Sequence, residues 1–350
     1  MRGAPPDLER HPIVVAWEVT RACGYRCRHC RADAMPRPAP GQLDHAESLA
    51  LIDDLARFAG SILVLTGGDP MLRPDLADLV ARAAGRGLRV ALTPSATARV
   101  TPERLDALRR AGVAQVAVSL DGPDAATHDA LRGVRGSFAR TLRILRHARE
   151  AGFPLQVNTT LTAGGLGRLD EMARRVATVR PALWSVFFLV PTGRGARGDM
   201  LPAHAQERAL RRLVRMRGRL PMPMKVTAAP AVRRVQDQMA AEGLIPPPPP
   251  PVPVNDGRGF MFVSHDGHVA PSGFLPLPAG NVRARSAVDL YRGAPLFRAL
   301  RDPSRLRGRC GRCEWRDVCG GSRARAFALS GDPLAEEPTC AYRPRRGRAC

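Results

Sequence analysis

The sequence predicts an α/β fold: an open parallel sheet followed by a small cysteine-rich extension. Six short apolar runs alternate with segments of helical periodicity, a pattern typical of parallel strands joined by right-handed crossovers. Six such units are fewer than the eight that close a complete barrel. A group of cysteines near the carboxyl terminus indicates the extension. The predicted strands are 13–19, 62–65, 89–92, 115–120, 155–161 and 184–190.

The composition limits the classes of partner. The chain has 350 residues and a formal net charge of +22, and Lys225 is its only lysine. So strong an arginine excess, with abundant alanine and proline, indicates genome composition bias rather than a basic interface. Only 5% of residues are aromatic, too few for the stacking platforms of single-strand binders, so no nucleic-acid partner is expected. Steering of a carboxylate-rich substrate by the basic surface is the weaker alternative.

No stretch of the sequence points to a membrane. The most apolar run, 183–190, is far shorter than the ~18 residues that span a bilayer. Residues 1–11 lack the apolar core of a signal peptide. We therefore expect a cytoplasmic protein with no membrane partner, in which the thiols serve as ligands rather than disulfides.

Three cysteines follow the first predicted strand. Cys23, Cys27 and Cys30 are spaced x3 and x2 on one short loop. Thiolates suit Fe–S clusters, zinc or Cu(I), and a cluster held by three cysteines keeps one iron open to an outside ligand. In a (β/α) barrel this loop lies at the carboxyl end of the strands, where active sites form. A coincidental triplet is the competing interpretation of so short a motif.

The next elements carry clear boundary signals. Asp44 with Glu47 predicts the start of a helix that ends before Gly60. Thr101 and Pro102 predict the start of another helix, and Gly112 its end. Further helices are predicted over 74–86, from a cap at Ser137 to Gly152, around 169–179, over 204–220 and up to Glu242.

The second strand ends in Thr66-Gly67-Gly68-Asp69-Pro70. Glycines let the backbone approach a ligand closely, and the carboxylate can accept hydrogen bonds from an ammonium group. The fourth strand ends in Ser119-Leu-Asp121-Gly122, which reads equally well as a simple turn.

Together these motifs resemble the radical S-adenosylmethionine (radical SAM) family, whose hallmark is the Cys-x3-Cys-x2-Cys loop. The resemblance implies an open (β/α)6 TIM-type barrel and a [4Fe–4S] cluster, held by Cys23, Cys27 and Cys30, whose open iron binds SAM. It implies that His29 lies near the adenine, where the family has an aromatic residue. Thr66, Gly67, Gly68 and Asp69 stand at the family's Gly-Gly-Glu-Pro motif, with Asp69 one methylene shorter than the usual glutamate. Ser119 and Asp121 would lie near the ribose, and Asn158 and Thr160 are candidates for lining the SAM pocket.

The C-terminal cysteines form a second set. Cys310, Cys313, Cys319 and Cys340 can complete a site with no vacancy, and on chemistry alone zinc rivals iron–sulfur. Their spacing is similar to the SPASM extension of radical SAM enzymes, which implies auxiliary [4Fe–4S] binding. Complete SPASM domains hold two such clusters. Here Arg323 stands where a cysteine of the other cluster is usual, and 271–273 has no thiol, so we predict one auxiliary cluster and an unligated Cys350.

Within that group, the stretches 319–326 and 331–333 and the pair Glu337-Pro338 resemble the radical SAM enzymes of heme d1 and alternative heme synthesis. This resemblance implies modification of tetrapyrrole side chains, with SAM, a porphyrin substrate and a reductase, flavodoxin or ferredoxin electron donor as partners. A SPASM-type maturase of a ribosomally made peptide is one alternative. A non-catalytic zinc-bound nucleic-acid protein is another.

The predicted organisation has four parts. They are an N-terminal arm (1–11), a radical SAM core barrel (12–200), a helical and proline-rich connector (201–254) and a SPASM-like auxiliary domain (255–350). The proline run 246–251 has no amide donors and is expected to be an extended spacer.

Overall fold

The structure is a computed structural model that describes residues 7–345. Within them ten strands form one sheet in the order β10-β9-β8-β1-β2-β3-β4-β5-β6-β7. β1 to β7 run parallel, β8 runs parallel to β1, and β9 and β10 are antiparallel to their neighbours. The sheet is not closed, which confirms the predicted open α/β barrel. The strands are β1 Val14–Thr20, β2 Ile62–Gly67, β3 Arg89–Leu92, β4 Val113–Ser119, β5 Leu155–Leu161, β6 Leu183–Phe188, β7 Met224–Thr227, β8 Phe260–Val263, β9 His268–Ala270 and β10 Gly280–Asn281.

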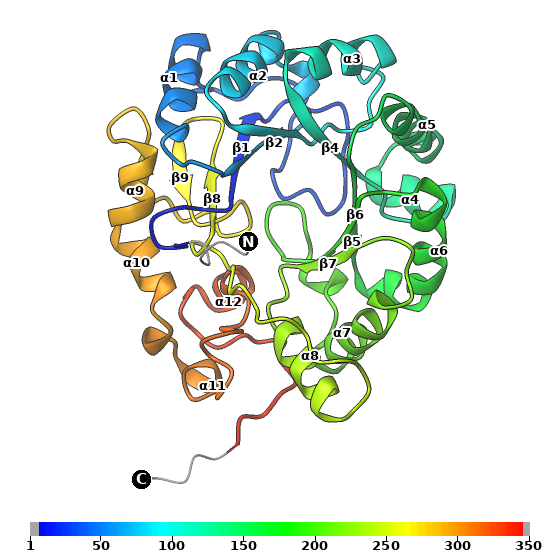
Figure 1. The fold of residues 1–350 in the computed structure, drawn as a ribbon, viewed down its shortest axis with the longest axis vertical. Coiled ribbons are helices and arrows are strands. Elements are labelled where there is room, and N and C mark those ends of the chain that lie inside the picture. Colours follow the sequence, from blue (N-terminus) through cyan, green and yellow to red (C-terminus); the bar gives the residue numbers. More distant parts are fainter. Residues whose placement is uncertain (1–6, 346–350) are drawn as a thin grey trace.

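Helices surround the strands. Figure 1 shows α1 to α8 outside the curved sheet, and α9 to α11 (orange) continuing around it on the side of β8 and β9. The helices are α1 His45–Leu55, α2 Leu76–Gly85, α3 Pro102–Ala111, α4 Ala125–Arg132, α5 Ser137–Glu150, α6 Leu169–Val179, α7 Ala203–Arg217, α8 Val232–Ala241, α9 Ala287–Gly293, α10 Pro295–Arg301, α11 Gly308–Gly311 and α12 Arg323–Ser330. Short 3-10 turns are η1 Pro70–Leu72, η2 Ala163–Arg168, η3 Arg197–Asp199 and η4 Pro303–Arg305.

Alternation along the strands separates the main core from the barrel interior. Val15, Trp17 and Val19 of β1 belong to the large apolar cluster between sheet and helices. Ala16 packs instead with Phe262 of β8 in a separate small cluster on the opposite face. Trp17 is completely buried, and a side chain of this kind contributes roughly 1.5–3 kcal/mol or more by its burial. The other face of β1 is therefore free to carry polar groups.

Local capping chemistry sets several helix ends. Asp44 and Glu47 form the predicted capping box at α1. Thr101 caps α3, and Gly112 ends it in the left-handed region with φ 119°. At α5 the prediction was wrong by one residue: Gly136 is the N-cap, and the Ser137 hydroxyl donates to Asp129 Oδ1 at 2.7 Å.

Several elements were not predicted, among them β7 and α4 within the barrel. β7 lies in the stretch expected to be helical and extended, and it pairs in parallel with β6. α4 follows the Asp-Gly turn after β4, capped by Asp124 and ended by Gly133 in the left-handed region. The proline run 246–251 forms neither helix nor strand and is mostly exposed.

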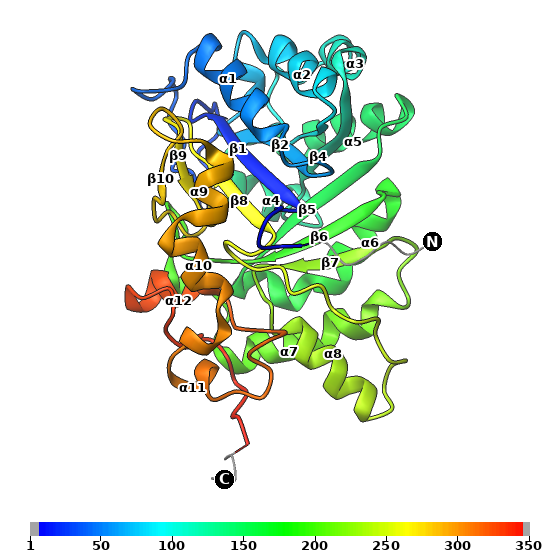
Figure 2. The same ribbon diagram turned by 60° about the vertical axis from the view of Figure 1, so that its left-hand side comes forward.

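The C-terminal third of the chain joins the same sheet. β8 pairs with β1 from Val14↔Phe260 to Trp17↔Val263, and β9 returns antiparallel to β8 after a turn at Asp266-Gly267. Figure 2 shows β8 (yellow) running beside β1 (blue). The strand that leads into the first cysteines is thus held on both edges.

Within residues 7–345, no helix combines the length and the apolar character needed to cross a bilayer. The seven cysteines in this range are all free thiols. Cys350 lies outside the described residues.

Candidate functional site

The first three cysteines lie together on the loop that follows β1. Cys23 and Cys27 are buried, and both pack in a small cluster with Tyr25, against which Cys30 is partly buried. The loop leaves the carboxyl end of a strand paired on both sides, so its starting point is fixed. The structure brings the three predicted ligands into one place.

Neighbouring segments clamp the backbone of this loop. Arg194, in the turn after β6, donates its backbone N–H to Cys30 O at 3.0 Å and its Nε–H to Cys27 O at 3.0 Å. Its Nη1 donates to Ala34 O and to Asp33 Oδ1, both at 2.9 Å. A Cβ on the preceding Gly193 would lie 2.4 Å from Cys30 O, so only glycine allows this contact.

The Cys23 thiol is linked to the glycine motif through Ser95. Cys23 Sγ lies 3.5 Å from Ser95 Oγ, and that hydroxyl donates to Gly68 O at 2.7 Å. The Tyr25 backbone N–H also donates to Cys23 Sγ at 3.3 Å. Burial raises the pKa of the Cys23 thiol, so metal binding must displace its proton.

The Cys27 thiol lies beside a buried cation. Arg132, the last residue of α4, donates from Nη1 to Cys27 Sγ at 3.7 Å. Its Nη2 lies 2.7 Å from Asp121 Oδ2. Burial raises the pKa of the Cys27 thiol, and the positive charge of Arg132 opposes that effect. This geometry favours a thiolate at Cys27 once a metal is present.

Two predicted SAM-contacting residues meet at the same point. His29 Nε2 lies 3.4 Å from Asp121 Oδ2, whose side chain is completely buried. Burial raises the pKa of Asp121, but the charges of Arg132 and His29 outweigh it and hold that pKa well below its ordinary value. The Thr160 backbone N–H donates to Asp121 Oδ1 at 2.7 Å.

The paired glycines pack the second strand against the first. A Cβ on Gly67 would lie 2.2 Å from Thr20 O, and one on Gly68 would lie 2.2 Å from Ala22 O. Gly67 also has φ 140°. Any larger residue at either position would push the glycine motif away from the cysteine loop.

Asp69 is held by protein donors. Its carboxylate accepts from the backbone N–H groups of Met71 at 3.2 Å and Ser95 at 3.3 Å, and from the Thr97 hydroxyl at 2.7 Å. Burial raises the pKa of Asp69. The visible role of this side chain is to fix the motif to the 93–97 loop, and its contact with SAM stays a prediction.

The remaining predicted SAM residues line the barrel side of the sheet. Ser119 of β4 is the register partner of Asn158 of β5, and Asn158 Oδ1 accepts from Gln156 at 2.7 Å. Thr66, at the end of β2, pairs in register with Glu18 of β1. The predicted residues therefore spread from β2 to β5 around the carboxyl end of the sheet.

Sequence reasoning missed three side chains of the site: Ser95, Arg132 and Arg194. Arg132 had a readable signal, because Asp124 and Gly133 bound a short helix by ordinary start and stop rules. Ser95 and Arg194 had none, since both act through contacts far away in the sequence.

The residues fit a cubane cluster by their chemistry. The donor set is entirely sulfur, comes from one clamped loop, and supplies three ligands, as a cluster with one open iron requires. Within residues 7–345 no three His, Cys, Asp or Glu side chains converge tightly enough to chelate a single metal ion.

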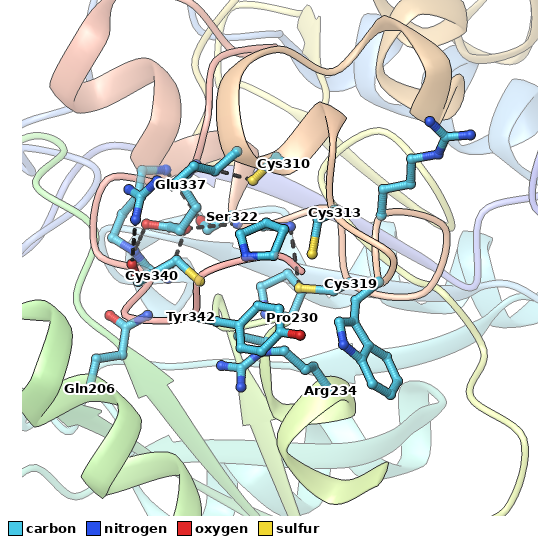
Figure 3. Close-up of a pocket in the computed structure, with 18 residues that line it drawn as sticks. Gln206, Pro230, Arg234, Cys310, Cys313, Cys319, Ser322, Glu337, Cys340 and Tyr342 are labelled. Atoms are coloured by element: carbon cyan, nitrogen blue, oxygen red, sulfur yellow. Dashed lines mark hydrogen bonds and ion pairs between the residues drawn. The ribbon is translucent and has the colours of Figure 1, made fainter. Parts of the chain in front are cut away.

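The four C-terminal cysteines line one pocket. Cys310, Cys313, Cys319 and Cys340 face a common space of about 510 Å³, including its open mouth (Figure 3). Burial raises the pKa of Cys319 to about 12. Backbone N–H groups of Gly321 and Glu337 donate to Cys319 Sγ at 3.4 Å and to Cys310 Sγ at 3.3 Å. Four thiols with N–H donors fit an auxiliary cluster without a vacancy.

Arg323 fills the position where the resemblance expects another cysteine. It is buried, and its guanidinium donates to Cys310 Sγ at 3.7 Å, to Pro333 O at 3.0 Å and to Ala335 O at 2.6 Å. Upstream, Ser272 is buried and its hydroxyl accepts from the Leu275 N–H at 3.2 Å. Both positions make structural contacts instead of offering thiols.

Glu337 connects two segments that line the C-terminal cysteine pocket. Its carboxylate accepts from Arg325 Nε at 3.1 Å and from the Ser322 backbone N–H at 2.8 Å. Both charged side chains are almost completely buried. Burial raises the pKa of Glu337, but Arg325 outweighs it and keeps that pKa below its ordinary value.

Comparison with known proteins accounts for this arrangement. Residues 17–178 match the model of the radical SAM superfamily. The chain is 40% identical over 346 residues to the AdoMet-dependent heme synthase of Nitratidesulfovibrio vulgaris, covering 96% of this chain and 94% of that protein. It is 31% identical to the mycofactocin maturase MftC of Mycobacterium ulcerans, covering 94% and 88%.

A solved structure shares the fold. The crystal structure of Streptococcus suis SuiB bound to precursor peptide SuiA superimposes with a TM-score of 0.74 and 14% identity, covering 95% of this chain and 76% of that one. With the cysteine loop, the glycine motif and the open parallel sheet in place, and a relative aligned over almost its whole length, this chain belongs to the radical SAM superfamily of enzymes.

Proposed function

We propose that this radical SAM enzyme modifies the propionate side chains of an iron tetrapyrrole, converting propionate to vinyl. The observation that carries the proposal is the 40% identity to a protein named as a heme synthase, which extends over nearly the whole of both chains. It therefore includes the C-terminal cysteines as well as the barrel.

The atoms and electrons of the propionate-to-vinyl conversion balance as follows. Each –CH2–CH2–COO⁻ group gives up one hydrogen atom from the carbon next to the ring and one electron to a one-electron acceptor. It then releases CO2 and leaves –CH=CH2. No proton must be abstracted by a general base, which suits a site whose polar side chains are largely engaged with each other.

The radical SAM cluster would be held by Cys23, Cys27 and Cys30. When bound, it supplies with SAM the 5′-deoxyadenosyl radical that removes the hydrogen atom. The protein's part is to hold the loop rigidly through Arg194, to place a positive charge beside Cys27 through Arg132, and to exclude water from Cys23 and Cys27.

SAM would lie along the carboxyl ends of β2, β4 and β5. We assign its methionyl end to Thr66, Gly67 and Gly68, with Asp69 holding this motif in place. We assign its nucleoside to His29, Ser119 and Asn158, with Asp121 orienting His29.

Cys310, Cys313, Cys319 and Cys340 would hold a single auxiliary [4Fe–4S] cluster, which supplies one-electron chemistry when bound. The support is the four-thiol pocket and the engagement of Arg323 and Ser272 in structural contacts. A cytoplasmic reductase, flavodoxin or ferredoxin would deliver the electrons.

The decisive experiment is anaerobic turnover of reconstituted protein with SAM, dithionite and Fe-coproporphyrin III. We expect 5′-deoxyadenosine together with a tetrapyrrole that has lost CO2 and two hydrogens per converted side chain, measured by mass spectrometry. Cys27→Ala is the negative control and should give neither product. Formation of 5′-deoxyadenosine without any change in the tetrapyrrole would reject the substrate class.

A SPASM-type maturation of a peptide is the second candidate, since the chain is also 31% identical to a protein named as a maturase. The sequence identity to the heme synthase is higher, and the alignment covers more of both chains. We therefore prefer a tetrapyrrole as the substrate. The non-catalytic interpretation is wrong, because the chain belongs to an enzyme superfamily.

A further inference from the structure

The chain's only lysine lies on a barrel strand. Of the 54 lysine and arginine residues, Lys225 alone is lysine. It lies on β7, between Met224 and Val226, which both pack against the main core outside the sheet. Because side chains alternate along a strand, Lys225 points to the opposite face, toward the barrel interior.

The register places Lys225 in a polar row across four strands. Ser119 of β4 pairs with Asn158 of β5, Asn158 with Ser185 of β6, and Ser185 with Lys225 of β7. Neighbouring strands lie about 4.8 Å apart, so the backbones of Lys225 and Asn158 are separated by roughly 10 Å. Asn158 is one of the residues assigned to SAM.

The Lys225 ammonium lies on the open interior side of β7. The side chain is exposed, yet desolvation by the surrounding protein lowers its pKa. No ion pair to Lys225 is found among residues 7–345, whereas most interior charges on the opposite wall are paired: Glu18 contacts Arg31 at 3.0 Å and His265 at 3.1 Å.

The opposite wall of the barrel combines a small apolar cluster with the paired charges of Glu18, Arg31 and His265. Ala16, Phe262 and Ala270 form a small cluster on the interior face of β1, β8 and β9, with Val64 and Phe260 packed against it. The opposite wall is therefore partly apolar and partly charged, whereas the wall that carries Lys225 offers hydroxyl, amide and ammonium groups. A ligand that enters the barrel beside Lys225 is matched by a carboxylate at its edge.

We infer that Lys225 binds a carboxylate of the substrate inside the barrel. This inference rests on the proposed tetrapyrrole function and deepens it, since it names the group that anchors one propionate. An ammonium is a compact donor with three hydrogens, and it pairs with a carboxylate more strongly in a desolvated site than at the surface.

The test is a binding measurement on the reconstituted holoenzyme. Fe-coproporphyrin III is titrated into wild-type protein, Lys225→Met and Lys225→Arg, with binding followed by absorbance. We expect Lys225→Met to weaken affinity about tenfold or more, and Lys225→Arg to retain most of it. The exposed Arg219 precedes β7, and Arg219→Met, which removes one charge outside the barrel, is the matched control with unchanged affinity.

A second ligand separates charge recognition from structural damage. The methyl-ester form of the same porphyrin, in detergent, should bind wild type and Lys225→Met equally. Thermal unfolding and substrate-independent 5′-deoxyadenosine formation should also be the same in both proteins. Equal affinity of wild type and Lys225→Met for Fe-coproporphyrin III would overturn the inference, as would an equal loss for the ester.

The two proposals fail in different ways. If wild type converts Fe-coproporphyrin III but Lys225→Met binds it normally, only the role of Lys225 is rejected. If wild type neither binds nor converts this porphyrin, the proposed function is rejected and the inference falls with it.

Discussion

Arg132 and Asp121 form a largely buried ion pair, with Arg132 Nη2 2.7 Å from Asp121 Oδ2 and only the Asp121 side chain completely buried. The other nitrogen of the guanidinium, Nη1, donates to Cys27 Sγ. One cation therefore serves both a carboxylate that orients His29 and a thiol that would bind iron.

Arg132→Met should destabilise the protein by about 3–5 kcal/mol, because it leaves Asp121 charged and unpaired in the interior. The midpoint potential of the reconstituted radical SAM cluster should also fall, since a nearby positive charge favours the more negative reduced state. Chemical denaturation and potentiometric EPR measure the two effects. Adding Asp121→Asn should recover part of the stability, and because it removes a negative charge near Cys27 it should also bring the potential part of the way back. An unchanged potential in Arg132→Met would contradict the assigned role.

Gly67→Ala should lose the radical SAM cluster or SAM binding. Its Cβ would lie 2.2 Å from Thr20 O in a backbone region unfavourable for alanine, so β1 and the glycine motif must separate. We expect a loss of several kcal/mol of stability and reduced iron retention. Gly164→Ala is the matched control, since no atom lies within 4 Å of its Cβ. Equal iron and SAM binding in both variants would refute the close-approach argument.

Arg194→Met should loosen the cysteine loop without changing its ligands. The substitution removes side-chain hydrogen bonds to Cys27 O and Ala34 O. Hydrogen exchange over residues 27–34 should become faster, and iron retained after desalting should fall. Arg217→Met, an exposed charge at the end of α7, should leave both measurements unchanged. Hydrogen exchange at the wild-type rate in Arg194→Met would show that the hydrogen bonds of the Arg194 side chain do not hold the cysteine loop.

Glu337→Ala should affect the auxiliary pocket alone. The change leaves Arg325 buried without its partner, which costs about 3–5 kcal/mol, and removes the carboxylate that fixes Ser322 N–H. Iron content should fall toward that of a single cluster, while Cys23, Cys27 and Cys30 keep theirs. The double variant Glu337→Ala with Arg325→Met should regain part of the stability. Loss of all iron from the Glu337→Ala variant would contradict the expectation that the two cysteine sites bind iron independently.

Because His128 is buried in its neutral form, we expect the free energy of unfolding to fall in mild acid. Burial lowers the pKa of this imidazole from 6.5 to about 4, and its Nδ1 accepts from the Asp121 backbone N–H at 3.1 Å, as a neutral ring does. Below pH 6.5 the unfolded chain binds a proton that the folded one does not, so stability falls as pH drops toward 4. Between pH 7 and pH 5 the contribution is about 2 kcal/mol. In urea denaturation at both pH values, His128→Asn should show a smaller decline. An identical decline would exclude His128 as its source.

Features set by local chemistry were predicted well. The capping residues of α1 and α3 match the structure because a helix end is decided by a few neighbouring side chains and the conformational freedom of glycine. β5 was also predicted with its observed bounds, since Leu155–Leu161 alternates regularly between buried and half-buried residues. The resemblance to tetrapyrrole-modifying radical SAM enzymes, read from C-terminal motifs, is confirmed by the named relative.

Features that depend on contacts between residues far apart in the sequence were not predicted. β7 is four residues long, follows two prolines and carries Lys225, so nothing in it favours a strand until β6 lies beside it. The partner of β1 on its second edge depends on residues more than two hundred positions away. In the site, the spacing of the cysteines identifies them from the sequence. Arg132 and Arg194 can be recognised only after the positions of α4 and of the turn after β6 are known.

The pairing of β8 with β1 has a consequence for how the enzyme is made. A ribosome must synthesise residues up to Val263 before Val14–Thr20 gains its second neighbour, so the nascent strand bearing the iron-binding loop spends most of translation with one bare edge. A chain truncated before Phe260 would therefore carry the cysteine loop on a strand with one unpaired edge.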